Sequence, residues 1–158
     1  MSEKFIIRPM AESDFTALKP LMRELHAVHS DARPDFYTVS DDPLDEAAFG
    51  YWFGEDKHAF VAEQDGELLG FLTGYIVRYA GRPLHQPMIH FYVDTLGVTA
   101  SARRRGIGKA LMQAAERVGK EAGADRMTLG VWAFNRGARD FYEDFGFVER
   151  EIRMEYRF

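Results

Sequence analysis

A run of basic residues and glycines between an expected strand and an expected helix points most directly to chemistry. Arg103-Arg104-Arg105 follows an alternating segment that ends at Val98, and Gly106-Ile107-Gly108-Lys109 opens a stretch with helical apolar spacing. The first N–H groups of a helix have no partner within the helix, and the helix dipole adds partial positive charge there. The segment therefore predicts an anion site for a ligand that carries phosphate.

Two better-known phosphate motifs do not fit this turn. A P-loop requires glycine where Arg103 stands and Ser or Thr where Ala110 stands, and a dinucleotide fingerprint requires Gly or Ala where Leu111 stands. An ordinary basic helix entry, in which the glycines only form a local turn, is the alternative that this segment leaves open. A second motif at a suitable distance is needed to decide between the two.

A second pattern downstream supplies that motif, and the two together resemble the GNAT acyltransferase superfamily. The first signature of that superfamily has Arg or Gln, two variable residues, Gly, one variable residue, then Gly or Ala, which Arg103, Gly106 and Gly108 match. The residues similar to its second signature are Asn135, Ala138, Phe141-Tyr142 and Phe145-Gly146-Phe147. The resemblance covers residues 88–147 and implies acyl transfer from an acyl-CoA, with acetyl-CoA as the usual cosubstrate.

The resemblance implies an α/β (α+β) fold in which the cofactor lies in a split sheet. The sheet is expected to be mixed and mostly antiparallel, with about six to seven strands and helices on both faces. A splay is expected between two central strands that end near Val98 and Trp132. Backbone N–H groups from Arg104 to Lys109 would bind the pyrophosphate, and main-chain groups of Leu96 and Val98 would pair with the pantetheine arm. Asn135 would contact the same arm, and it also suits a helix N-cap.

Tyr142 and Asp94 are the catalytic residues that the resemblance implies. Tyr142 matches the general acid that protonates the departing CoA sulfur, and a core aromatic is the alternative reading. Asp94, like its neighbour Tyr92, lies where family members place a Glu or His that removes a proton from the amine, often through water. It would otherwise position a cationic amine or only bond to the backbone.

The protonation of the amine explains why a base is needed. A free alkylamine has a pKa of about 10.4, so near pH 7 only about one molecule in a thousand is neutral. An aspartate with an ordinary pKa of about 3.9 is a poor base for an ammonium, so direct action by Asp94 requires burial or a relaying water.

Composition restricts the other partners. The 158 residues contain 20 Lys and Arg against 25 Asp and Glu, a net charge of −5 at pH 7, so nucleic acid is not an expected partner. The chain has no cysteine, which excludes an acyl-cysteine intermediate and a thiolate metal site. His26 and His29 are three residues apart, but no third ligand is identifiable and no metal is expected.

The chain is also expected to be cytoplasmic and to make no contact with a membrane. Residues 1–4 lack the pattern of a signal peptide, and no apolar run approaches the ~20 residues of a membrane span. No repeat or linker interrupts the chain, which predicts a single N-acetyltransferase domain over residues 1–158.

Apolar spacing predicts the elements that precede the site. A short strand at residues 5–7 is followed by a helix through Leu18 and Val28, and Asp42-Pro43 is expected to cap a second helix. Asp65-Gly66 predicts a tight hairpin between strands at 60–63 and 68–76, because both central residues of such a turn need positive φ.

The segment 88–98 is expected to be the strand that carries chemistry. Its alternation places Ile89, Phe91, Val93 and Thr95 on one face and His90, Tyr92, Asp94 and Leu96 on the other. Gly97 is expected to mark a bulge. Residues 127–132 are expected as the next strand. A half-buried strand from Ile152 to Phe158 can pair across a homodimer interface, which is common in the family that the chain resembles.

The acceptor is expected to be selected by two loops, 30–42 and 80–87. The first contains several aspartates with Phe36 and Tyr37, a rim that suits a small-molecule amine, a polyamine or a peptide amino group, although such aspartates are also ordinary turn residues. The leading hypothesis is direct acetyl transfer in a ternary complex. The alternatives are a non-catalytic acyl-CoA-binding sensor or regulatory module and a nucleotide-binding module of another kind.

Overall fold

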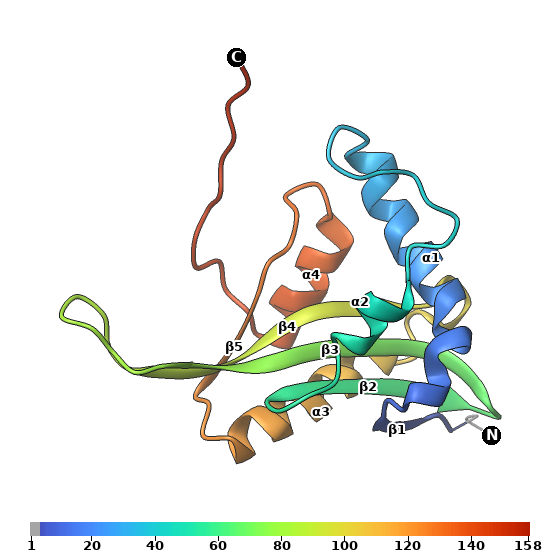
Figure 1. Ribbon diagram of the computed structural model, residues 1–158, viewed down its shortest axis with the longest axis horizontal. Helices are drawn as coiled ribbons and strands as arrows, with labels where there is room; N and C mark the ends of the chain where they lie inside the picture. Colours follow the sequence, from blue (N-terminus) through green and yellow to red (C-terminus); the bar gives the residue numbers. More distant parts are fainter. Residues whose placement is uncertain (1–3) are drawn as a thin grey trace.

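The computed structural model describes residues 4–158, whose strands form one five-stranded sheet (Figure 1). The strands, in sheet order, are β1 (Ile6–Pro9), β2 (Lys57–Gln64), β3 (Glu67–Tyr79), β4 (Met88–Val98) and β5 (Arg126–Leu129). All neighbours are antiparallel except β4 and β5, which are parallel. Residues 1–3, which entered the signal-peptide argument, lie outside the described residues.

Helices cover both faces of this sheet, as expected. One face carries α1 (Phe15–Ala32) and α2 (Glu46–Gly50), and the other carries α3 (Ile107–Glu121) (Figure 1). The helix α4 (Arg136–Phe145) stands over the place where β4 and β5 part. Short 3₁₀ turns, Glu12–Asp14 and Ala100–Ala102, precede α1 and α3. Among residues 4–158, no helix combines the length and the apolar character needed to cross a membrane.

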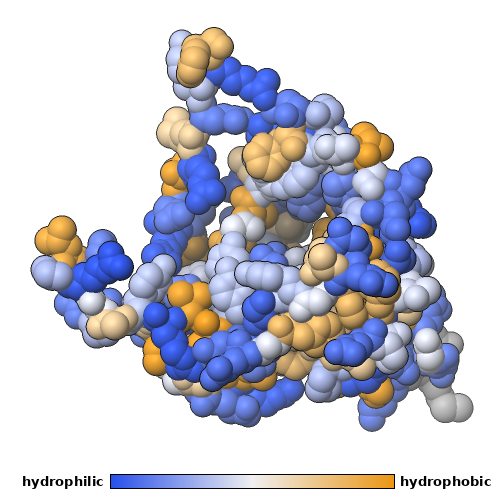
Figure 2. Space-filling view, in the orientation of Figure 1, coloured by the Kyte–Doolittle hydropathy of each residue, from blue (hydrophilic) through white to orange (hydrophobic). Residues whose placement is uncertain are grey.

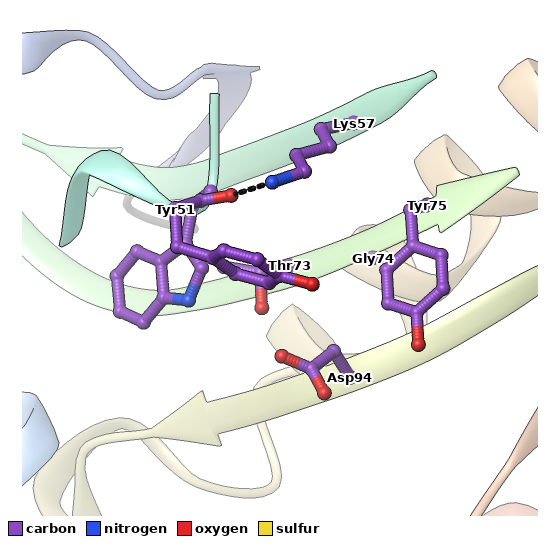
Figure 3. A pocket seen from close by; sticks show the side chains of 7 residues that line it. Tyr51, Lys57, Thr73, Gly74, Tyr75 and Asp94 are labelled. Atoms are coloured by element: carbon purple, nitrogen blue, oxygen red, sulfur yellow. Dashed lines mark hydrogen bonds between the residues drawn. The ribbon is translucent and has the colours of Figure 1, made fainter. Parts of the chain in front are cut away.

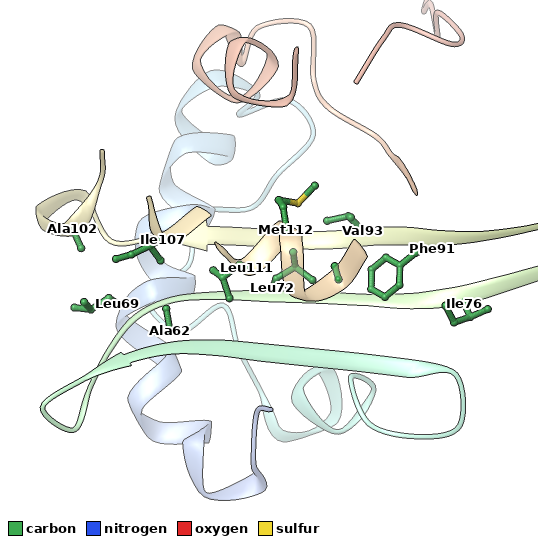
Figure 4. Close-up of a cluster of buried hydrophobic side chains, with 11 residues drawn as sticks. Ala62, Leu69, Leu72, Ile76, Phe91, Val93, Ala102, Ile107, Leu111 and Met112 are labelled. Atoms are coloured by element: carbon green, nitrogen blue, oxygen red, sulfur yellow. The ribbon is translucent and has the colours of Figure 1, made fainter. Parts of the chain in front are cut away.

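Alternate side chains of the central strands divide the core into two clusters. Leu72 in β3 packs towards α3, and its neighbour Phe71 packs towards α1, as the pleat of a strand requires. The cluster beside α3 is drawn in Figure 4. Its buried members are Ala62, Leu69, Leu72, Ile76, Phe91, Val93, Ala102, Ile107, Leu111, Met112 and Ala115. The helical stripe that begins at Ile107 is thereby confirmed.

Two local features near the N-terminal half test the turn chemistry. The hairpin at Asp65-Gly66 is confirmed, since both residues have positive φ, 51° and 83°. The helix predicted to start at Asp42 starts later: the side chain of Asp45 accepts a bond from Ala48 N at 2.7 Å, and Asp42 instead pairs with Lys19 at 2.8 Å. Leu44 lies between the two aspartates and is buried, so the chain must enter the core before the helix begins.

The bulge in β4 lies at Asp94, and the expectation of a bulge at Gly97 was wrong. Thr95 pairs with Thr73 and Val93 pairs with Gly74, which leaves Asp94 without a partner residue in β3. Gly97 stays in regular register with Phe71, and a Cβ on it would lie 2.9 Å from the Phe71 ring. Glycine is needed at 97 for close packing.

This extra residue changes which side chains share a face of β4. Leu96 and Val98 pack against the same cluster as Phe91 and Val93. The expected grouping of Thr95 with Val93, and of Leu96 with Tyr92, was therefore wrong beyond the bulge, because an inserted residue reverses the alternation.

The C-terminal part of the chain also departs from the expectation. The strand β5 ends at Leu129, before Trp132, and the expected strand Ile152–Phe158 is extended but has no strand partner among the described residues. Residues 148–158, here called the C-terminal arm, extend away from the sheet (Figures 1 and 2) and contact the loop after α1 through two ion pairs, Glu155 with Arg33 at 2.7 Å and Arg157 with Asp35. The sheet thus has five strands where about six to seven were expected.

Candidate active site

The edge of β4 opens at the bulge. Pairing with β5 runs only from His90 to Val93, so no residue of β5 pairs with the stretch from Asp94 to Val98 in the described chain. Leu96 and Val98, the residues expected to bind the pantetheine arm, lie on this open stretch. Unpaired N–H and C=O groups of an edge strand are ready to pair with an extended ligand.

The basic turn after β4 has a backbone suited to an anion. Arg104 and Gly106 both have positive φ, 61° and 82°, and Gly106 is the N-cap of α3. Positive φ is rare for arginine and carries a cost of about 1–2 kcal/mol, which indicates a local constraint. Ala110 N makes the first bond of the helix, to Gly106 O at 3.0 Å, so the N–H groups of the preceding helical residues remain available at its N-terminus.

The side chains of this turn are mostly free to face a ligand. Arg103, Arg104, Arg105 and Lys109 are all exposed. Arg105 donates a bond to Gln64 Oε1, and Arg103 Nε reaches Val98 O at 3.4 Å. Gly108, at the start of α3, has a packing role as well, because a Cβ there would lie 3.2 Å from the ring of Phe141. Glycine at position 108 therefore lets the Phe141 ring of α4 pack closely against the start of α3.

The helix α4 positions Asn135 and Tyr142. Asn135 Oδ1 accepts a hydrogen bond from Ala138 N at 3.2 Å, so Asn135 is the N-cap of α4, as its sequence position predicted. The NH₂ group of its side chain does not take part in this cap. Tyr142 is partly buried between the rings of Phe141 and Phe147, with centroids at 5.3 and 5.7 Å. Burial raises the pKa of Tyr142 to about 12, which keeps its phenol protonated at neutral pH.

Asp94 faces a small hollow on the α2 side of the sheet (Figure 3). The hollow is lined by Tyr51, Trp52, Lys57, Thr73, Gly74, Tyr75 and Asp94. The carboxyl of Asp94 is exposed to this hollow, yet the surrounding protein atoms raise its pKa by desolvation. A carboxylate with a raised pKa is a better proton acceptor than an ordinary aspartate.

The profile of the acetyltransferase (GNAT) family matches residues 25–147, well over half of the chain. The chain belongs to this family. The resemblance to this family drawn from residues 88–147 is thus confirmed.

Three proteins are similar to this chain in sequence or in fold. The mycothiol acetyltransferase of Streptomyces avermitilis is 31% identical over 129 residues, which is 78% of this chain but only 37% of that relative's length. A mutant BH1408 protein from Bacillus halodurans has a TM-score of 0.93 at 24% identity, covering 97% of this chain and 99% of the other. The aminoglycoside N-acetyltransferase AAC(6')-Iy in complex with CoA has a TM-score of 0.74 at 22% identity, covering 99% and 96%. The two structures establish the fold alone.

The sequence-based reading of the GNAT site missed part of the hollow. Thr73 and Tyr75 come from β3, and Tyr51 and Trp52 come from the C-terminal end of α2. A threonine inside the apolar run Phe71 to Ile76 was the one signal available. The loop 80–87, expected to bind the acceptor, does not line the hollow and forms the far tip of the β3–β4 hairpin (Figure 1).

The loop 30–42 does reach the splay, through aromatic contacts with the loop after β5. Trp132 Nε1 donates to Tyr37 Oη at 2.8 Å, and the Arg33 guanidinium lies 4.7 Å from the centre of the Trp132 ring. His26 Nε2 and His29 Nδ1 lie 2.7 and 2.9 Å from the backbone oxygens of Thr38 and Leu25. Across residues 4–158, no three His, Cys, Asp or Glu side chains gather to hold a metal ion.

Proposed function

We propose that residues 1–158 form a single N-acetyltransferase domain that transfers the acetyl group of acetyl-CoA to a primary amine by direct attack in a ternary complex. One observation carries this proposal. The bulge in β4 directs the carboxylate of Asp94 towards the hollow. Asp94 is also the first residue of the stretch of β4 that no β5 residue pairs with. An acceptor in the hollow and an extended cofactor on the strand edge would therefore meet at one point of β4.

The cofactor would lie along the basic turn and the open edge. The N–H groups from Arg104 to Lys109 would hold the pyrophosphate, with arginine side chains of the turn adding charge. Leu96 and Val98 would pair with the pantetheine arm, and Asn135 would offer its NH₂ group to the same arm. The solved CoA complex of AAC(6')-Iy, whose fold this chain shares, supports CoA as the ligand.

The reaction removes two protons from the ammonium nitrogen and supplies one to the departing sulfur. Asp94, directly or through a water, would take a proton from the ammonium so that the nitrogen can attack the thioester carbonyl carbon. As the C–S bond breaks, Tyr142 would donate its proton to the sulfur, and the second proton of the nitrogen would pass through water and restore the phenol. The phenol of pKa about 12 is a weaker acid than a thiol of pKa about 8.5 in water, but the same apolar surroundings also raise the basicity of the departing thiolate.

Release of free CoA thiol tests the proposal. Acetyl-CoA is incubated with the protein and a panel of alkylamines, polyamines, aminoglycosides, amino acids and peptides, and the chain adds no background because it has no cysteine. We expect release that depends on one class of amine and that the double variant Tyr142→Phe/Asp94→Asn abolishes. Binding of acetyl-CoA without release on any amine would overturn the transferase and favour the sensor.

We further propose that the chain forms a homodimer through its C-terminal arm. Four large apolar side chains of the arm, Ile152, Met154, Tyr156 and Phe158, are at least 79% exposed. Their alternation suits a strand with one covered face, and β5 is an edge strand of the sheet with a free side. Two copies can exchange arms symmetrically, each arm joining the partner's β5.

Light scattering tests this assembly. The full chain is expected to show twice its 18.1 kDa mass, and a chain that ends at Phe147 is expected to be a monomer. The variant Ile152→Asp/Met154→Asp keeps the length and should also dissociate the dimer. A full chain that stays monomeric at 100 μM would overturn the proposal.

A further inference from the structure

The hydroxyl of Thr73 is a buried polar group that has no role in the acetyl transfer proposed above. Thr73 is 1% exposed, and its Oγ1 has no hydrogen-bond partner among residues 4–158. Buried hydroxyl groups are nearly always bonded, because an unbonded one loses its hydration without compensation. A group of this kind that lines a hollow points to a ligand.

The position of Thr73 is set by the same bulge as that of Asp94. Thr73 pairs with Thr95 in the last regular pair before the register shift, and Gly74 is the next residue of β3. Since Gly74 has no side chain, β3 approaches β4 closely there, and both the Thr73 hydroxyl and the Asp94 carboxylate lie in the hollow (Figure 3). The two groups come from adjacent strands and lie against one small volume.

We propose that Thr73 positions the acceptor: its hydroxyl accepts an N–H from an amine carried on an unbranched methylene carbon, while Asp94 lies beside the same nitrogen. This inference rests on the proposed acetyl transfer and specifies the acceptor. A primary ammonium has three N–H donors, and one of its protons must leave before attack. Once Asp94 has taken that proton, directly or through a water, the nitrogen has one lone pair, and the second N–H held by Thr73 limits how the nitrogen can turn to present this lone pair to the thioester carbon.

The size of the hollow supports an unbranched amine. It has room for about one water-sized group, whereas a pocket that encloses a whole drug-sized ligand is far larger. Only the amine-bearing end of an acceptor can enter it. A carbon that carries a second substituent beside the nitrogen, such as the α-carbon of a peptide amino terminus, needs additional width between the walls.

The walls themselves favour a cation with a short apolar stem. Tyr51, Trp52 and Tyr75 contribute aromatic rings, which attract an alkylammonium and cover its methylene group. The hollow does contain a cation of its own, Lys57, but its ammonium donates to Tyr51 O at 2.6 Å and lies 3.4 Å from the centre of the Tyr51 ring. Lys57 is therefore already partnered and forms part of the wall.

Two variants of Thr73 and two isomeric amines test the inference. Thr73→Val removes the hydroxyl at nearly constant shape, and Thr73→Ser keeps it. Butan-1-amine and butan-2-amine differ only in branching beside the nitrogen. For each protein, kcat and KM are measured for both amines and for acetyl-CoA, together with the melting temperature.

We expect Thr73→Val to lower kcat/KM for butan-1-amine by about 10- to 100-fold, the loss of a hydrogen bond to a charged or reacting nitrogen. The KM for acetyl-CoA should not change, Thr73→Ser should recover most of the activity, and the melting temperature of Thr73→Val should equal or exceed that of the wild type. The wild type should prefer butan-1-amine over butan-2-amine by at least about 10-fold.

Contrary results separate the two levels of the proposal. If the wild type acetylates butan-1-amine and Thr73→Val does so equally well, Thr73 has no positioning role although the transferase stands. If both isomers react equally, or if only α-amino acceptors react, the unbranched class is wrong. If no amine releases CoA from the wild type, the proposed function and this inference fail together.

Discussion

Gly74 in β3 approaches β4 so closely that a Cβ on it would lie 2.4 Å from the backbone oxygen of Tyr92 and equally close to a ring carbon of Phe91. Real Cβ atoms do not approach other atoms to this distance, so the space at 74 is available to glycine alone. The contact lies beside the unpaired residue of β4, Asp94. The close approach of β3 to β4 beside the proposed base therefore requires glycine at position 74.

Replacement of Gly74 by alanine should destabilise the protein and impair catalysis together. The added methyl group has to push β3 away from β4, and overpacking of this kind costs about 1–3 kcal/mol of the free energy of unfolding. Gly137→Ala is the matched control, because a Cβ at 137 meets nothing within 4 Å and lies in α4. The control should gain about 0.5–1 kcal/mol from helix propensity. Urea unfolding of both variants measures the difference; an unchanged Gly74→Ala would mean that the strands separate freely.

Asp94→Asn should lower the activity and raise the stability of the protein at pH 7. Desolvation by the surrounding protein atoms raises the pKa of Asp94 in the folded protein, so its ionisation is easier in the unfolded chain and stability falls as the pH rises through the folded pKa. The asparagine variant lacks this loss, and its free energy of unfolding should exceed that of the wild type at pH 7 but not at pH 3. A variant that is less stable at pH 7 would show that the Asp94 charge is stabilised by the fold.

The pH profile of catalysis tests the same carboxyl. The kcat/KM of the wild type should rise with pH through the titration of Asp94, at a pKa above the ordinary 3.8, and this limb should be absent in Asp94→Asn. An identical acid limb in both proteins would assign the base to another group.

Tyr142→Phe should slow turnover with little effect on binding or stability. The ring remains packed between Phe141 and Phe147, and only the hydroxyl is lost. General acid catalysis typically contributes about 10²–10⁴-fold, so kcat should fall by a factor in this range while the KM for acetyl-CoA is retained. Because the pKa of Tyr142 is about 12, the wild-type rate should show no loss of the acid below pH 10. A kcat within a factor of two of the wild type would leave Tyr142 as a core aromatic.

The ion pair of Arg8 with Asp14 should govern acid stability. Both guanidinium NH groups of Arg8 bond to the buried carboxylate, at 2.8 and 2.9 Å, and this lowers the pKa of Asp14. A lowered folded pKa stabilises the protein above the ordinary value of 3.8, and this stability is lost as the pH falls through the folded pKa. Asp14→Asn should lower the free energy of unfolding by about 1–3 kcal/mol at pH 7. The urea midpoint of the variant should also depend less on pH in the acid range than that of the wild type.

The pair of Lys19 with Asp42 is the control for this prediction. The Asp42 side chain is 59% exposed, and exposed pairs contribute about 0–1 kcal/mol. Asp42→Asn should therefore leave both the midpoint and its pH dependence nearly unchanged. Equal losses at 14 and 42 would remove the special role of the buried carboxylate.

The element order and the basic turn were predictable because their signals are local. Asp65-Gly66 encodes its own positive φ values, and the apolar stripe from Ile107 identifies α3 without knowledge of its neighbours. The bulge was misplaced because a glycine in a strand signals either a bulge or a close approach, and Gly97 serves the approach of Phe71. Asp94, the residue that does bulge, has no distinguishing local pattern.

The hollow and the C-terminal arm were beyond the sequence for another reason, since both depend on partners distant along the chain. Thr73 becomes a buried group without a bond only once α2 covers β3 and the register with β4 is set. The alternation of Ile152 to Phe158 predicted a half-buried strand, but these residues are exposed and form no strand, because alternation contains no information on which strand edge will receive the segment.

The two tryptophans of the chain lie at separate points of the proposed site. Trp52 forms a wall of the hollow that would receive the amine, and Trp132 lies in the loop after β5, hydrogen-bonded to Tyr37 and covered by Arg33. Their intrinsic fluorescence should therefore report on different places, the hollow for Trp52 and the loop after β5 for Trp132. Single Trp→Phe variants would separate the two signals, so that the order in which the substrates bind can be followed optically in the unlabelled protein.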